Sequence, residues 1–244
     1  MSSRRLNALK VTLKNILALI SLLLLSPLGF AQSSKPTPFF AQYQATSKGL
    51  PCGGGWQRLF QEAQHYRLQS QGDFCLFGGE VDSDVVLQWQ STRWQSIRFE
   101  ASVKRWFRHD QYQGKNPSGT QMLVFKEGKL LDDPEFAPAT QDPATMIQNL
   151  GLAISEQQQD LFTDYTWGDE TRHYPFEWLG DDTIEFNGKP YAAYHLRQTH
   201  PKKSRVADFW FAPALNHQLI QMTVHRLGIK VLHVELTEFS AASH

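Results

Sequence analysis

The stretch that decides the fold is Ile97–Phe107, which reads IRFEASVKRWF. Apolar and polar residues alternate along most of it. Successive side chains of a β-strand point to opposite faces of the sheet, so a period of two predicts a strand with one buried face and one wetted face. The residues that we expect on the buried face are Ile97, Phe99, Ala101, Val103 and Phe107.

Similar alternation on both sides of this stretch predicts a chain dominated by antiparallel strands. Turn signals separate the segments, above all Asn187-Gly188, because both residues tolerate a positive φ. Glu127-Gly128 is a second turn signal. The other predicted strands are 40–47, 65–74, 81–89, 122–126, 129–131, 176–186, 190–198, 206–211, 217–225 and 229–239.

The last two predicted strands also allow a register to be predicted. Met222 shares a face with Ile220 and Val224 on the first of these strands. Leu232 shares a face with Val234 and Leu236 on the second. These faces coincide only if the connection has an odd number of residues. We therefore expect a three-residue loop, Arg226–Gly228, which sets Met222 opposite Leu232.

One segment breaks the β pattern and predicts a helix near residues 143–158. Asp142-Pro143 is typical of a helix start, with Asp as the N-cap and Pro in the first turn. Met146, Ile147, Leu150 and Ile154 follow at helical spacing. No Gly- or Ser-rich linker divides the chain. We expect a single, mainly β domain over 32–244, in which a large curved antiparallel sheet packs around this helix.

Residues 1–31 have the features of a cleaved secretory signal. Basic residues such as Arg4 and Lys14 precede the apolar run Ile16–Leu25, and Gly29-Phe30-Ala31 offers small residues at a cleavage site. The apolar run is too short for a transmembrane helix, which needs about 20 residues. The sequence therefore predicts a periplasmic protein with no membrane span after cleavage.

Net charge and cysteine content further narrow the class of protein. After removal of 1–31, which holds four of the 24 basic residues and no acidic one, 20 Lys and Arg remain against 24 Asp and Glu, a formal charge of −4. This balance argues against a nucleic-acid partner. Cys52 and Cys75 are the only cysteines. In an exported chain they predict a structural disulfide.

The sequence offers no established catalytic or metal-binding pattern. We find no zinc-binding helix motif and no nucleophile elbow, and we expect neither a metal nor a cofactor. The paired carboxylates Asp132-Asp133 and Asp181-Asp182 each fit a turn better than an active site. Cys52–Gly55 resembles a phosphate loop only superficially, because it lacks a Lys and a following helix, so we expect a flexible strand connection there.

Aromatic residues make up 12% of the chain and suggest a different role. Phe209 and Phe211 share one face of a predicted strand, and Trp210 lies on the other. Such residues fill a core or line an apolar groove, and both interpretations remain open at this point.

Five segments of the C-terminal half have a familiar order and spacing: Asp142–Ile147, Tyr174–Phe176, Ile184–Leu196, Phe209–Pro213 and Leu219–Gln221. In these segments the chain resembles DUF3108, a family of exported bacterial proteins of unknown function. The resemblance covers roughly residues 140–239 and no catalytic motif. It implies a periplasmic protein with a curved sheet around a helix, similar in outline to the half-barrels of lipoprotein carriers.

Three functional hypotheses follow. The preferred one is a non-enzymatic protein that binds a lipid-like or other apolar ligand between sheet and helix, or maintains the envelope. One alternative is a hydrolase of cell-wall sugar or ester bonds that uses Asp and His. The other is a scaffold whose exposed edge strand pairs with another envelope protein. The residues predicted to line the ligand site are Ile97, Phe99, Val103, Phe107, Phe209 and Phe211.

Overall fold

The structure is a computed structural model, and the part that it describes belongs to one compact unit, Lys35–His244. The predicted signal peptide, Cys75 and Phe107 lie outside the described residues. The described ranges are 36–74, 79–90, 92–105, 108–116, 122–131, 141–155, 161–167, 170–200 and 204–241.

The described residues form a single antiparallel sheet of fourteen strands. Eight strands precede the helix: β1 (Phe39–Ser47), β2 (Leu50–Glu62), β3 (His65–Phe74), β4 (Gly79–Gln90), β5 (Arg93–Arg105), β6 (Arg108–Lys115), β7 (Leu123–Lys126) and β8 (Lys129–Leu130). Six follow it: β9 (Leu161–Trp167), β10 (Glu170–Phe186), β11 (Lys189–His200), β12 (Arg205–Ala212), β13 (Gln218–Arg226) and β14 (Ile229–Ala241). The helix α2 spans Pro143–Ser155, and a short 3₁₀ turn, η1, spans Pro213–Leu215.

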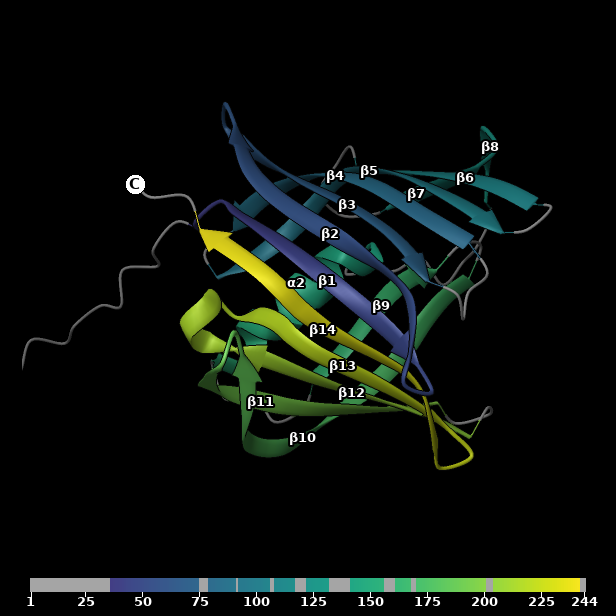
Figure 1. The fold of residues 1–244 in the computed structure, drawn as a ribbon. Helices are drawn as coiled ribbons and strands as arrows, with labels where there is room; N and C mark the ends of the chain where they lie inside the picture. The colour runs from purple at the N-terminus through teal and green to yellow at the C-terminus, as the bar shows by residue number, and fades with distance from the viewer. Residues whose placement is uncertain are drawn as a thin grey trace, which may run out of the picture. The chain divides into compact units, whose positions relative to one another are not determined.

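The strand order shows how two meanders join into one sheet. Strands β1 to β8 follow one another in space, as do β9 to β14, and β1 pairs with β14 to connect the two series. β8 and β9 are the edges of the sheet, which is not closed into a barrel. The sheet curves around α2 (Figure 1), which confirms the predicted mainly β fold with one helix.

The start of α2 has the predicted cap. Asp142 Oδ1 accepts hydrogen bonds from the backbone N–H of Ala144 (3.0 Å) and of Thr145 (2.9 Å), which satisfies two donors that the first helical turn leaves open. The helix contacts β4, β5, β9 and β13. In the described part of the chain, no helix has the length and apolar character needed to cross a bilayer.

Helix α2 is also fixed to β5 by a side chain in its middle. Asn149 Oδ1 accepts a hydrogen bond from the N–H of Trp94 (2.7 Å), and its Nδ2 donates to the carbonyl oxygen of Trp94 (2.9 Å). Both backbone polar groups of one strand residue are thus paired with a helix side chain. These two hydrogen bonds set the position of the helix along β5.

The last hairpin has the predicted faces but not the predicted loop. The turn has two residues, Leu227 and Gly228, with φ of 50° and 78°. A bulge between Val224 and His225 restores the alternation, so Met222 lies opposite Val234. The predicted three-residue loop and the pairing of Met222 with Leu232 are therefore wrong, because a two-residue turn plus a bulge also satisfies the parity condition.

The predicted flexible connection at Cys52–Gly55 is also wrong, because this segment belongs to β2. Gly54 and Gly55 pair with β1 on one side and with β3 on the other. A Cβ on Gly54 would lie 2.6 Å from the carbonyl oxygen of Tyr43, and one on Gly55 would lie 2.5 Å from that of Gln71. The glycines thus permit a close approach of three strands.

Candidate functional site

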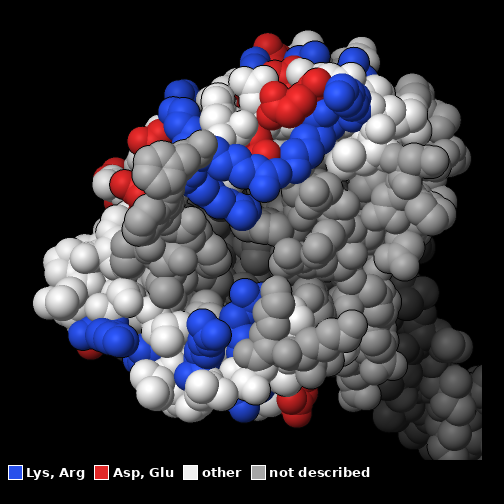
Figure 2. Space-filling view, turned by 90° about the vertical axis from the view of Figure 1, so that its right-hand side faces the viewer, with Lys and Arg blue, Asp and Glu red and all other residues white. Residues whose placement is uncertain are grey.

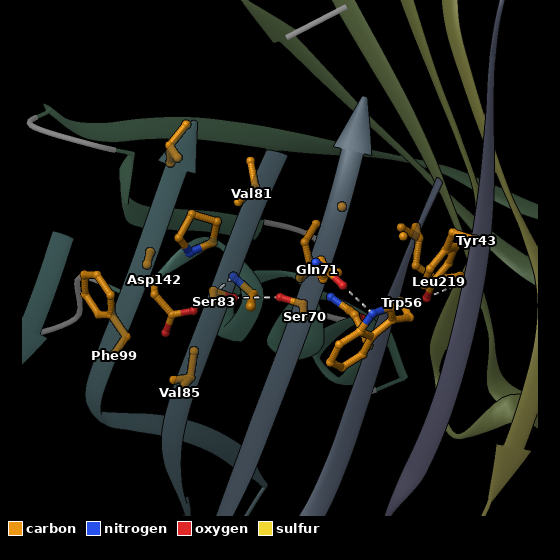
Figure 3. Close-up of a pocket in the computed structure, with 18 of the residues that line it drawn as sticks. Tyr43, Trp56, Ser70, Gln71, Val81, Ser83, Val85, Phe99, Asp142 and Leu219 are labelled. Atoms are coloured by element: carbon orange, nitrogen blue, oxygen red, sulfur yellow. Dashed lines mark hydrogen bonds between the residues drawn. The ribbon is translucent and has the colours of Figure 1, made fainter. Parts of the chain in front are cut away.

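A pocket of about 320 Å³ lies between α2 and the inward face of β1 to β6, and we call it the inner pocket (Figure 3). Strands β1 to β5 supply most of its wall. Helix α2 and its cap cover it with Asp142, Pro143, Ala144 and Ile147, and Leu219, Met222 and Val234 close it on the side of β13 and β14.

The floor of the inner pocket is made of small side chains that the strand register aligns. Ser70 of β3 lies opposite Ser83 of β4, which lies opposite Ala101 of β5. In the next inward row, Gly55 lies opposite Gly72. Side chains that lie opposite each other on neighbouring strands share a face, so these short residues together leave the space that longer ones would fill.

Large apolar residues border this floor on one side. The row next to Ser70 and Ser83 consists of buried side chains that pack against one another along the sheet, and the ring of Phe99 ends this row by lying over Gly114. A Cβ on Gly114 would lie only 2.0 Å from Cε1 of Phe99. The residues of the row are Phe39, Leu59, Leu68, Val85 and Phe99.

The polar groups of the inner pocket bond mainly to one another. The hydroxyls of Ser70 and Ser83 lie 2.6 Å apart, and Trp56 Nε1 donates to Gln71 Oε1 over 2.9 Å (Figure 3). Asp142 is occupied by capping α2. A buried carboxylate with its acceptors filled is poorly suited to general acid–base chemistry.

The hydroxyl of Tyr43 is held in a similar way. It donates to the carbonyl oxygen of Leu219 (3.2 Å) and accepts from Gln218 Nε2 (2.6 Å). Burial raises the pKa of Tyr43 well above its usual value, and the hydrogen bond from Gln218 only partly opposes this rise. Tyr43 is therefore a neutral wall residue.

The structure divides the predicted lining residues into two groups. Phe99 and Val103 line the inner pocket. Ile97 does not, because it is the extra residue of a β-bulge: Ser96 pairs with Leu87 and Arg98 pairs with Val86. The bulge interrupts the alternation. Inward-facing residues of β5 therefore have even numbers before Ile97, such as Ser96, and odd numbers after it, such as Phe99.

The predicted lining role of Phe209 and Phe211 does not fit the inner pocket. Both are buried against Met146, Leu150 and Ile154 of α2. The helix comes close because it has a glycine at this contact: a Cβ on Gly151 would lie 2.3 Å from the carbonyl oxygen of His217 and 3.0 Å from Phe211. These two phenylalanines form a solid core, and Phe107, the last of the predicted set, lies outside the described residues.

The opposite face of β12 carries Asp208 and Trp210. Trp210 is buried, stacks on His195 with a centroid distance of 4.3 Å and donates from Nε1 to Asp182 (2.9 Å). Asp208 is 3% exposed and lies near three cationic or titratable groups. Its nearest partners are Arg197 Nε at 2.7 Å, His195 Nε2 at 3.2 Å and His225 Nδ1 at 3.8 Å.

This cluster bears on the hydrolase alternative. Asp208 and His195 are within hydrogen-bond reach, but they face away from α2 and are not part of the inner pocket. Asp181-Asp182, predicted to lie in a turn, is instead part of β10. The hydrogen bonds from the backbone N–H of Thr183 and then from Trp210 lower the pKa of Asp182. Among the described residues, no group of three His, Cys, Asp or Glu side chains could hold a metal ion.

A second hollow, of about 380 Å³, involves the polar face of β3 to β6. Its carboxylates include Asp84 and Glu100, which lie opposite each other on β4 and β5. Arg67 donates from Nε to Asp84 Oδ1 (2.7 Å), and this hydrogen bond lowers the pKa of Asp84. An ionised, paired Asp84 is a poor proton donor, so Asp84 is not the acid with a raised pKa that a glycosidase requires.

Residues of the floor were not predicted from the sequence. Their signal is a set of small residues at every second position, such as Ser70 and Gly72 in β3. In the neighbouring β4, Ser83 lies between two inward-facing valines, Val81 and Val85. The pattern becomes a pocket only when the register places these positions side by side.

Comparisons with known proteins support the fold. No protein-family model and no curated protein matches the chain. The chain is similar to a solved β-barrel-like protein of the domain of unknown function DUF1849 from Brucella abortus, with a TM-score of 0.53 and 11% identity over 86% of this chain and 99% of that chain. The hypothetical lipoprotein YmcC from Escherichia coli matches at a TM-score of 0.31 and 16% identity, over 86% and 90% of the two chains. At these identities, the first likeness shows the architecture alone, and nothing is concluded from the second.

Proposed function

We propose that this protein binds a lipid-like, apolar ligand in the inner pocket and performs no chemistry on it. The observation that carries the proposal is the floor of Gly, Ser and Ala residues, bordered by Phe99 and Val85 and covered by α2. A volume of about 320 Å³ is at the lower end of the range typical of small-molecule sites, which are concave and mostly apolar.

The described wall of the inner pocket holds no free acid–base pair, which supports binding over hydrolysis. Asp142, the carboxylate that lines the inner pocket, caps α2, and Tyr43 is held neutral by burial. The contact between Asp208 and His195 lies on the other face of the sheet. The hydrolase alternative therefore has no support from the described part of the pocket wall.

The predicted cellular setting belongs to the same proposal. Residues 1–31 predict export, and residues 140–239 resemble the exported DUF3108 family; both remain predictions. In the periplasm, an apolar ligand needs a protein to shield it from water. The scaffold alternative would use an edge of the sheet; of the two edges, β8 has only two residues and β9 has seven.

The test is the uptake of a fluorescent fatty acid by the mature chain, with native mass spectrometry of protein purified from the periplasm. Ser83→Leu places a larger side chain on the pocket floor, whereas Ser102→Leu places the same side chain on the outward face of the adjacent strand. We expect Ser83→Leu to reduce probe affinity about tenfold or more and Ser102→Leu to leave it within about twofold. Equal affinity of both folded variants, or a wild type that takes up no probe, would overturn the proposal.

A further inference from the structure

The inner pocket has one cationic side chain in its described wall, Arg105, at the end of β5. Its guanidinium forms no hydrogen bond or ion pair with any residue that the structure describes. Val103, the preceding inward residue of the same strand, is part of the apolar wall. A cation is thus placed where the apolar part of the pocket meets the end of the sheet.

Asp110, a carboxylate on the strand next to Arg105, is already bound to other groups. Asp110 lies opposite Val103 and is 6% exposed; it accepts from Arg108 Nε (2.8 Å) and lies 3.5 Å from Lys126 Nζ. Burial alone would raise the pKa of Asp110, but the hydrogen bond from Arg108 and the charge of Lys126 hold it below its usual value. Asp110 is therefore ionised, and its charge is paired with Arg108 and Lys126.

The same end of the sheet carries like charges on neighbouring strands. Arg105 lies directly opposite Arg108, and Arg205 lies directly opposite Arg226. Like charges directly opposite each other destabilise a sheet, and a bound anion would reduce this repulsion. Figure 2 shows this end of the molecule, where Lys and Arg side chains gather along both rims of a hollow.

Arg105 is exposed at the end of β5 and also lines the inner pocket, so a ligand can reach its guanidinium. It differs from two other cations that have a carboxylate partner, since Arg67 pairs with Asp84 and Lys104 pairs with Glu80. It also differs from Arg98 of the same strand, which lies on the outward face.

We propose that the ligand is an anionic amphiphile, whose carboxylate or phosphate head binds Arg105 at the end of β5 while its apolar chain lies over the small-residue floor. This inference rests on the proposed function and adds the chemical class of the ligand. Arginine recognises both carboxylates and phosphates through paired N–H donors. The structure therefore assigns an anionic head group, and the experiment below distinguishes a carboxylate from a phosphate.

The experiment compares three probes of equal chain length: laurate, lauryl phosphate and lauryl alcohol. Each is titrated into the mature chain by calorimetry or by displacement of a fluorescent apolar probe. We expect wild type to bind at least one anionic probe about tenfold or more tightly than the alcohol, as charge-assisted hydrogen bonds imply. The anion that binds more tightly identifies the head group.

Variants of two arginines on one strand complete the test. Arg105→Gln should lose most of the preference for the anion while its affinity for lauryl alcohol stays within about twofold, and Arg105→Lys should restore part of the preference. Arg98→Gln removes the same charge from the outward face and should change nothing.

The outcomes separate this inference from the proposed function. If none of the three probes binds, the proposed function fails. If the alcohol binds as well as both anions, or if Arg105→Gln weakens all probes equally, the pocket binds apolar chains and the anionic head is wrong.

Discussion

The inward faces of β1 to β6 and of β10 to β13 belong to the same sheet and share the same helix, yet one is hollow and the other is filled. We call them the hollow half and the filled half. In the filled half, Phe209 and Phe211 belong to one buried cluster with Met146 and Leu150 of α2. In the hollow half, Ser70, Ser83 and their neighbours leave the inner pocket. The comparison teaches that side-chain size, and not strand topology, decides where this fold keeps a cavity.

The position of α2 preserves this difference. Asn149 bonds to the backbone of Trp94, and Ser96 bonds to Thr145 (2.8 Å) and to Asp142. These contacts hold the N-terminal part of the helix on β5, at the border of the pocket. The helix therefore does not need a ligand to stay in place, which is consistent with a site that is formed in advance.

The largest expected effect is the loss of a side chain from the filled half. Phe211 is fully buried, so Phe211→Ala should lower the free energy of unfolding by about 3–5 kcal/mol. Val103→Ala in the wall of the hollow half removes a partly buried side chain beside existing space, and we expect a loss of about 1 kcal/mol. Urea unfolding of both variants measures the difference. Equal losses would contradict the division into two halves.

The next effect concerns the cross-link predicted for the hollow half. The β2–β3 register ends with Gly53 opposite Phe74, and in the sequence a cysteine precedes Gly53 and another follows Phe74. Cys52 is buried and is not a free thiol. If it pairs with Cys75, Cys52→Ser should reduce stability by about 3 kcal/mol, because the bridge restricts the unfolded chain.

The double variant Cys52→Ser/Cys75→Ser is the control for this cross-link. It should be no less stable than either single variant, because each single substitution already removes the whole disulfide. Additive losses would contradict the pairing. A confirmed bridge would show that the hollow half, with its small side chains, relies on a covalent link where the filled half relies on packing.

The smallest expected effect is a pH dependence in the filled half. Burial lowers the pKa of His217, whose usual value is 6.5, so the folded state favours the neutral ring. Its contribution to stability is complete above about pH 6.5 and is lost as the pH falls toward the lowered pKa, because the unfolded chain binds the proton first. His217→Asn removes the titration and tolerates the φ of 57° at this position.

Thermal unfolding between about pH 7.5 and 5 tests this prediction. The Tm of wild type should fall more steeply than that of His217→Asn across the interval. Parallel curves would mean that another group governs this range. The ion pair of Arg67 and Asp84 should not contribute to the slope, because the pKa of Asp84 is lowered from 3.8 and the pair loses stability only in more acidic solution.

Much of the fold could be predicted because its signals are local. The strand 65–74 and the turn Asn187-Gly188 follow from alternation and from residues that accept a positive φ. The cap at Asp142 follows from a short motif. Strand β2 was not predicted, because Gly53–Gly55 weakens every strand signal while serving close contact with β1 and β3.

The site was only partly predicted because it depends on relations between strands. Phe99 and Val103 follow from the alternation within β5, but the bulge at Ile97 cannot be read from apolar spacing. Phe209 and Phe211 were predicted as lining because large apolar residues suit both a groove and a core. Only the position of α2 decides between these roles, and no local pattern specifies which half of the sheet the helix fills.

The row that runs through Ser70, Ser83 and Ala101 has one more consequence. Each strand contributes one position to this row. Replacing one of these residues by a larger one would therefore shorten the inner pocket by about one strand spacing. If the inner pocket binds an apolar chain, as proposed, a bulky residue at position 101 would shorten the longest chain that fits from the β5 side. A bulky residue at position 70 would shorten it from the β3 side. Substitutions in this row would then change the length of the proposed ligand while every strand pairing stays as it is.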